Sequence, residues 1–298
     1  MADTRAQEYK QKLDALTREA KAMGPDMRRA VLEELESANR EILAALAHAD
    51  PSSYSTAKLQ ALRGEVARIM QSLQQSLSSE VSQAQAAAYS SSASSVDAVV
   101  RSAYGNLAIP PMVDVNMLAI AQGYSADLVS GLTADGTLKI NAAIQRAALG
   151  KTNLTDLIDQ VGRVLNNGEA TGLFTALGDR AQTVATNEVM RMQSLASDAR
   201  IRQLADHHPG LMKEWVHVPA ARVPRVSHLL ADGQTRKPDE PFDVAGESLM
   251  YPRDPSGSAE NTINCHSIQR PKVAPEVLKP TDQERALLKS AGIHVFVS

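Results

Sequence analysis

Apolar residues recur at helical spacing through the first third of the chain. Between residues 4 and 22 they are three or four positions apart, at Tyr9, Leu13, Leu16 and Ala20. Similar stripes run over residues 27–47 and from residue 55 to 77. We expect Gly24-Pro25-Asp26 to separate the first two helices, with Asp26 as the cap of the second. The pattern predicts an N-terminal helical bundle or hairpin over residues 1–105.

Residues 78–98 are rich in Ser, Ala and Gln and allow two interpretations. They form either a flexible linker or a helix whose small side chains pack closely against a neighbour. The stretch from Asn106 to Met112 contains two consecutive prolines and predicts a boundary.

A second helical region is expected over residues 106–208. Gly136 and Gly150 punctuate it, and residues 166–168, Asn-Asn-Gly, are a turn signal. Residues 172–204 predict one long helix. Residues 207–210, His-His-Pro-Gly, should end it, because proline and glycine stop helices.

After Gly210 the pattern changes to that of a small α+β module over residues 209–298. Residues 214–218 alternate polar and apolar side chains as a strand does, and six prolines between 219 and 255 exclude a long helix. A helix near residues 281–291 and a strand at 293–297 are expected to close the module. The predicted fold class is therefore mainly α (α+β). Its N-terminal two thirds are helical, and its small C-terminal α+β module has short strands and Pro-rich loops.

Composition narrows the class of protein. Aromatic residues make up 3% of the chain, so its apolar mass is aliphatic, and the net charge of -3 gives no bulk signal for nucleic-acid binding. A single Cys fits a reducing compartment. The N-terminus lacks the apolar stretch of a signal peptide, and no window approaches the ~18 apolar residues of a membrane span. We expect a protein kept in a cytoplasm, or in a particle assembled there.

An ordered set of residues in the last third carries the most specific signal. In sequence order these are Trp215, Arg225, His228, Gly233, Phe242, Pro252, Asp254, Asn264 and Cys265, with Glu188 upstream. The set resembles the pattern of the phage head morphogenesis family, also called Mu F-like minor capsid proteins, over residues 150–270. One departure is that His266 and Ser267 stand where that family has Arg and a second Cys.

The resemblance implies a structural protein rather than an enzyme, with no cofactor and no metal. It implies a low-copy virion component in the capsid interior, assembled in the host cytoplasm. The expected partners are the portal protein and other procapsid components, with packaged double-stranded DNA as a further candidate and no membrane. The expected role is in genome packaging or delivery.

Arg225 and His228 leave two interpretations open. Because they are three residues apart, they share a face where the chain is helical. They form either an anion contact beside an acid/base histidine, or a buried polar network that holds a loop-rich module together. The first interpretation keeps a small nuclease or transferase, using Arg225, His228 and Glu188, as an alternative function. A DNA-binding adaptor inside the head is another.

The remaining candidates have plainer interpretations. Cys265 with His266, His228 and His217 allows zinc binding, but no Cys-x-x-Cys supports it, so Cys265 is expected to be a small buried side chain. Asn264 is expected to tie a turn through its side-chain amide. Gly233 is expected to form a turn with Asp232 between extended segments. Glu188 is expected on a solvated or salt-bridged helix face.

Overall fold

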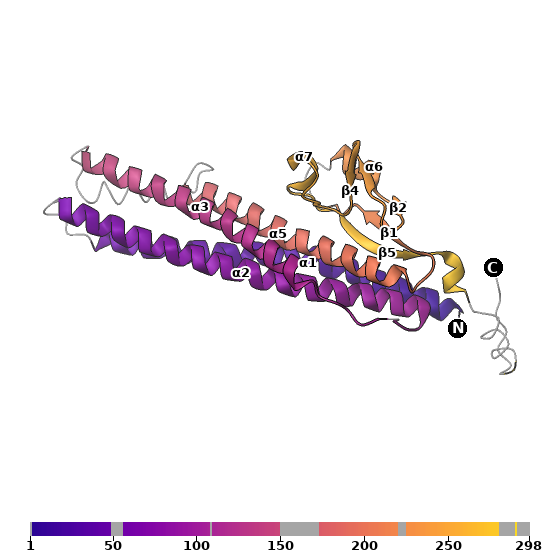
Figure 1. The fold of residues 1–298 in the computed structure, drawn as a ribbon. Coiled ribbons are helices and arrows are strands. Elements are labelled where there is room, and N and C mark those ends of the chain that lie inside the picture. The colour runs from indigo at the N-terminus through magenta and orange to yellow at the C-terminus, as the bar shows by residue number, and fades with distance from the viewer. Residues whose placement is uncertain are drawn as a thin grey trace. The chain divides into compact units, whose positions relative to one another are not determined.

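A computed structural model describes residues 2–48, 56–107, 109–149, 173–219, 225–279 and 290. The predicted fold class is confirmed, because long helices fill the N-terminal part and short strands lie in the C-terminal part (Figure 1). The long helices are α1 Ala2–Ala47, α2 Thr56–Tyr104, α3 Val115–Leu149 and α5 Leu173–Ala205.

The predicted break at residues 24–26 is wrong, because α1 runs through Pro25 without ending. A proline inside a helix costs about 3 kcal/mol, since it removes one main-chain hydrogen bond. Burial of the apolar stripe on both sides, including Leu16 before the proline and Val31 after it, offsets that cost. Asp26 caps no helix, and its carboxylate accepts a hydrogen bond from Arg29 at 3.2 Å.

Residues 78–98 are helical, so the linker interpretation is wrong. Small side chains such as Ala88, Ser92 and Ala93 are buried in this part of α2. α2 ends at Tyr104, followed by Gly105 with φ 83°, which confirms the break expected after residue 105.

Gly136 lies inside α3 and does not interrupt it, contrary to the prediction. A Cβ atom there would be 3.0 Å from Met70 Cε, so the glycine allows close helix packing. α5 closely matches the long helix expected from residue 172, and it ends before residues 207–210 as predicted. Gly150, the turn at 166–168 and the strand at 293–297 lie outside the described residues, as does the helix near 281–291 except for residue 290.

The contacts divide the chain into two compact units that cut across the three ranges expected from the sequence. Unit 1 comprises Met1–Gly24, Ala86–Val115 and Met190–Ser298, and unit 2 comprises Pro25–Gln85 and Asn116–Val189. Each unit therefore combines segments that are far apart in the sequence.

Unit 2 is helical in its described part. Its buried positions come from all four long helices, for example Val31, Ile69, Ile140 and Leu177. Two side-chain hydrogen bonds join α2 to α3: Gln85 donates to Ser125 Oγ at 2.8 Å, and Gln122 donates to the Ser82 carbonyl at 3.0 Å.

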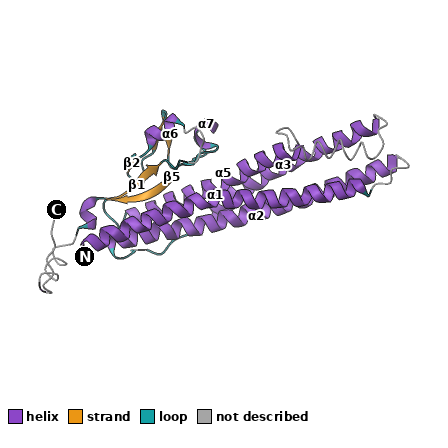
Figure 2. Ribbon diagram, turned by 180° about the vertical axis from the view of Figure 1, so that it is seen from behind, coloured by secondary structure: helices purple, strands orange, loops and turns teal. Residues whose placement is uncertain are grey.

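Unit 1 carries the strands (Figure 2). These are β1 Leu211–Val216, β2 Thr235–Arg236, β3 Phe242–Val244, β4 Glu247–Leu249 and β5 Ile268–Val273. Short helices α6 Val226–Ala231 and α7 Ala259–Thr262, and the 3-10 turn η1 Pro275–Leu278, connect or follow them. One antiparallel sheet has the order β2-β1-β5, and β3 and β4 form a separate antiparallel pair.

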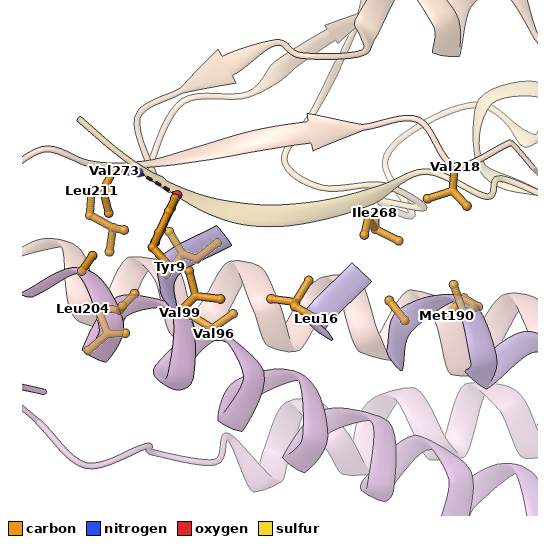
Figure 3. Packing of buried hydrophobic residues seen from close by; sticks show 14 residues of the cluster. Tyr9, Leu16, Val96, Val99, Met190, Leu204, Leu211, Val218, Ile268 and Val273 are labelled. Carbon is orange, nitrogen blue, oxygen red and sulfur yellow. Dashed lines mark hydrogen bonds between the residues drawn. The ribbon is translucent and has the colours of Figure 1, made fainter. Parts of the chain in front are cut away.

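The sheet packs on helices of the same unit through what we call the helix–sheet core (Figure 3). Its fourteen buried residues are Tyr9, Leu16, Ala20, Val96, Val99, Val100, Ala103, Met190, Ile201, Leu204, Leu211, Val218, Ile268 and Val273. They come from α1, α2, α5, the β1–β5 pair and, for Val218, the segment just after β1. The first turns of the chain are therefore buried against one of its last strands.

Tyr9 also covers the open edge of β5. Its hydroxyl donates to the Pro271 carbonyl and accepts from the Val273 N–H, both at 3.3 Å. Pro271 has no N–H, which suits the edge position of β5 in the sheet. One side chain of α1 thus satisfies two main-chain groups that would otherwise be buried without a partner.

Replacing Tyr9 with Phe should lower the free energy of unfolding by about 1–2 kcal/mol, because two buried main-chain groups lose their partner. Urea unfolding followed by circular dichroism measures the change. Tyr124→Phe, on a side chain that is 52% exposed, is the control and should unfold close to wild type. Equal midpoints for Tyr9→Phe and wild type would show that the edge contact contributes nothing.

Candidate functional site

Nine of the ten pattern residues belong to unit 1, and Glu188 belongs to unit 2. Trp215 lies in β1, His228 in α6 and Phe242 in β3, whereas the other six lie in the connections between elements. Glu188 is 3% exposed, so the solvated alternative is wrong, and the salt-bridged alternative stays a prediction.

Four pattern residues meet in a second buried cluster, which we call the motif core. It consists of Trp215, Ala231, Phe242, Val244, Leu249 and Cys265, and the His228 ring contacts it. The Trp215 ring meets Phe242 edge-on at 5.4 Å between centroids and meets His228 at 5.9 Å. Edge-to-face contacts of this kind stabilise a core beyond the area that they bury. The pattern residues therefore follow one another in the sequence because β1, α6, β3 and the loop after α7 each contribute a side chain to the same core, in that order.

His228 is 2% exposed and faces two side chains of the last motif. Its Nδ1 atom is 3.6 Å from Cys265 Sγ and 3.5 Å from Ser267 Oγ. Burial lowers the pKa of His228, the charges of Arg225 and Arg253 lower it further, and hydrogen bonding with Asn261 opposes them. The imidazole is therefore neutral near pH 7.

Arg225 is the residue before α6, and its own backbone is extended, with φ -72° and ψ 129°. A shared helical face for Arg225 and His228 therefore stays a prediction. Its Nη2 donates to the Ile263 carbonyl at 2.6 Å. Asn264 follows in the same turn with φ 53°, a left-handed conformation that Asn tolerates. The side-chain tie expected for Asn264 stays a prediction. Arg225 thus holds the end of α7 to the start of α6.

Gly233 has φ 76° and ends α6, so it does not join two extended segments as predicted. The expectation failed because the six-residue helix before it is too short to give a periodic sequence signal. The Gly233 N–H donates to the Trp215 carbonyl at 2.9 Å, and the Asp232 carboxylate accepts from the His217 N–H at 2.7 Å. The Asp-Gly pair therefore ties α6 back to the end of β1.

Pro252 and Asp254 shape the loop after β4. Pro252 is buried, and the Asp254 carboxylate accepts from the Met250 N–H at 2.8 Å and from the Ser256 N–H at 2.9 Å. Asp254 is thus a turn-forming residue.

Arg253, between them, was missed by the sequence reasoning, and its side chain donates four hydrogen bonds. It is 1% exposed with φ 67°, and burial lowers the pKa of its guanidinium. It donates to the Met190 carbonyl and Ser194 Oγ of α5, both at 3.3 Å, to the Ser267 carbonyl at 3.1 Å and to the Cys265 carbonyl. Its acceptors are uncharged oxygens. The only sequence signal was its place inside the Pro-x-Asp motif.

A buried ion pair makes a second tie to α5, this time from β1. Lys213, 0% exposed, donates to Asp198 at 3.0 Å and to the Met250 carbonyl at 2.7 Å, and its Nζ lies 5.2 Å from the centre of the Phe242 ring. Asp198 also accepts from Gln269 at 3.2 Å and pairs with Arg202 at 2.7 Å. Sequence periodicity gives no signal for a lysine that points inward.

The arrangement favours the buried-network interpretation of Arg225 and His228. Cys265, Ser267 and His228 carry reactive atoms, but each is at most 3% exposed, so a substrate could not reach them without local opening. Among the described residues, no group of three His, Cys, Asp or Glu side chains is arranged to hold a metal ion. No helix in the described part of the chain is long and apolar enough to cross a membrane.

Comparison with known proteins gives one partial likeness. The chain is 32% identical over 111 residues to the "Uncharacterized protein YqbB" of Bacillus subtilis (strain 168). The matched segment covers 36% of this chain and 35% of that protein, so about a third of the relative's length is spanned. No protein-family model matches the chain, and no solved structure matches it.

Arg253→Lys should lower the free energy of unfolding by about 2–4 kcal/mol, because an ammonium cannot reach four acceptors arranged around a planar guanidinium. Trp215 fluorescence during urea unfolding reports on this module directly, since the chain has one Trp. Arg101→Lys, at an exposed position of α2, is the matched control. If both variants unfold at the same urea concentration, Arg253 does not hold the module.

The module should lose stability as the pH falls below about 6.5, the ordinary histidine pKa. The folded state lowers the pKa of His228, so it favours the neutral form. This preference adds to the free energy of unfolding in full at pH values above the pKa that His228 has in the unfolded chain. The contribution is lost as the pH falls from that value towards the lower pKa of His228 in the folded state. His228→Gln should lower the melting temperature at pH 7.5 yet flatten its decline between pH 7 and pH 5.

The exposed His48, which follows α1 and lies outside the module, supplies the control, and His48→Gln should keep the wild-type pH profile. Burial also lowers the pKa of His208, which should leave a residual acid dependence in both variants. If the melting temperature of His228→Gln declined with falling pH as steeply as that of wild type, His228 would not be the source of the acid sensitivity.

Proposed function

We propose that this chain is a minor capsid or head morphogenesis protein of a bacteriophage. In this proposal it is a low-copy component inside the virion, associates with the portal protein and other procapsid components, and influences genome packaging or delivery. The family resemblance of the sequence pattern supplies the biological role.

The observation that carries the proposal is the burial of the pattern residues. Trp215 and Phe242 are 0% exposed, and His228 is 2% exposed beside Cys265. A catalytic histidine must reach a substrate, whereas a structural determinant must be packed. The burial of the pattern residues therefore fits a rigid adaptor better than an active site. It argues against the nuclease or transferase alternative.

The helices give secondary support. α1 and α2 have 46 and 49 residues, far beyond the 11–12 residues of an average helix. Long helices offer an extended surface for packing against other helical components of an assembly. A DNA-binding adaptor remains compatible with this architecture, although the net charge of -3 offers it no support.

The wild-type chain should co-sediment with the portal protein of the same phage at moderate salt. Binding should saturate at less than one chain per portal subunit, and it should change little between 50 and 300 mM salt. A folded chain that stays in the supernatant at all concentrations would overturn the proposal.

The alternatives have separate readouts in the same preparation. Binding to double-stranded DNA that falls by orders of magnitude over this salt range would favour the DNA adaptor. Turnover of a nucleic-acid substrate that His228→Gln abolishes without unfolding the module would favour the enzyme.

A further inference from the structure

The helix α3 carries few charges for a helix with an exposed face. Residues 115–145 contain three charged residues, whereas the 46 residues of α1 contain seventeen. A surface helix normally has charged side chains opposite its buried stripe, and a helix without them is normally covered on both faces. The composition of α3 is therefore that of a helix that is buried on two sides.

One face of α3 packs inside unit 2, and the opposite face is exposed. The packed face is formed by the buried residues Ser125, Val129, Leu132, Thr133, Gly136, Ile140 and Ile144. The exposed face, which we call the α3 seam, is formed by Ile120, Tyr124, Asp127, Gly131, Ala134 and Leu138. Ile120 is 74% exposed, Tyr124 52% and Leu138 70%. The seam thus presents three large apolar side chains and one charge to solvent.

The α3 seam has the spacing of a coiled coil. Its members follow one another at intervals of four and three residues in alternation, the spacing with which two helices pack along one continuous stripe. Gly131 leaves room in this stripe, because a Cβ atom there would meet no described atom within 4 Å. A second helix could therefore approach α3 closely along the seam.

The seam complements itself when a second copy runs in the opposite direction. In an antiparallel coiled coil centred midway along the seam, Ile120 lies opposite Leu138, and Tyr124 lies opposite Ala134. Each pairing occurs twice, because a two-fold interface brings the same surface of both copies together. The largest side chain of the seam thus faces a small one, and the two aliphatic side chains at its ends face each other.

Charge favours this antiparallel direction over the parallel one. In a parallel pair the two Asp127 carboxylates would lie side by side, and like charges at an interface are unfavourable. In the antiparallel pair Asp127 lies opposite Gly131, one helical turn from Asp135. Lys139 and Arg180 donate to Asp135 at 2.9 and 2.8 Å, so two cations and one carboxylate leave this group with a net charge of +1. The acidic residue of each seam therefore lies near a cationic group of the other copy.

We infer that two copies of this chain associate through their α3 seams, antiparallel and related by a two-fold axis. The inference goes beyond the proposed function and does not rest on it, since neither the portal nor DNA takes part in the contact. The seam spans residues 120–138, about 28 Å of helix. A single helix pair of this length falls short of the ~800 Å² per partner of a standard interface. The dimer should therefore be weak and reversible, with a dissociation constant in the micromolar range.

Sedimentation velocity over a concentration range of about 1–100 µM tests the association. Wild type should change from the 32.0 kDa monomer to a species of twice that mass as its concentration rises. The double variant Ile120→Ser, Leu138→Ser should dimerise at least tenfold more weakly, and it should keep the wild-type melting temperature because both side chains are exposed. Leu230→Ser, which changes a side chain that is 78% exposed in unit 1, is the matched control and should dimerise as wild type does.

A wild type that stays monomeric at every concentration overturns the inference. Equal dimerisation of the double variant and wild type also overturns it, because the contact would then lie elsewhere.

Disulfide cross-linking tests the direction of the pair. A chain carrying Ile120→Cys is mixed with one carrying Leu138→Cys under mild oxidation, and the native Cys265, which is 3% exposed, contributes little background. The mixture should form a disulfide between positions 120 and 138. Neither variant should cross-link alone, because equal positions lie about 27 Å apart in the antiparallel pair, far beyond the reach of a disulfide. Efficient cross-linking of Ile120→Cys with itself would show a parallel pair and overturn the inference.

Discussion

Within unit 1, α5 repeats a polar contact to the C-terminal module at every fourth residue. The Met190 carbonyl and the Ser194 hydroxyl accept from Arg253, and Asp198 accepts from Lys213. Burying a guanidinium or an ammonium is unfavourable unless its donors find acceptors, and this helix supplies them. The module needs such fixed points, because β2 has two residues and β3 and β4 have three each. The buried charges of Arg253 and Lys213, whose hydrogen bonds α5 accepts, therefore fix the positions of these short strands.

The long helices could be predicted because their apolar stripes repeat over many turns, and the change of pattern after Gly210 marked the module. Prediction failed where packing overrode a local preference, as at Pro25 inside α1 and Gly136 inside α3. The anchors on α5 were hidden for a different reason. Ser194, Asp198 and Arg200 are polar residues in a helix, and periodicity assigns such residues to solvent, although all three are at most 3% exposed. The charged partners that they meet across the core, Arg253, Lys213 and Asp97, lie in other elements, so the sequence of this helix alone carries no trace of them.

The candidate site was predicted as a set of residues, and the geometry gives the set a physical meaning. Trp215, His228, Phe242 and Cys265 could be identified in sequence, but a linear pattern cannot tell a packed core from a catalytic cleft. Burial separates the two, and it favours the core. Ser267, which the sequence pattern left without a role, presents its hydroxyl to the His228 ring.

The hydrogen bond between Tyr9 and Pro271 joins positions 262 residues apart. A ribosome releases Tyr9 long before it synthesises β5, so the apolar face around Tyr9, Leu16 and Ala20 lacks its sheet throughout most of translation. Non-local contacts of this span are slow to form, and uncovered apolar faces attract chaperones or other nascent chains. A chain that stops short of β5 would keep that face uncovered, so chains truncated before β5 are marked for recognition by protein quality control.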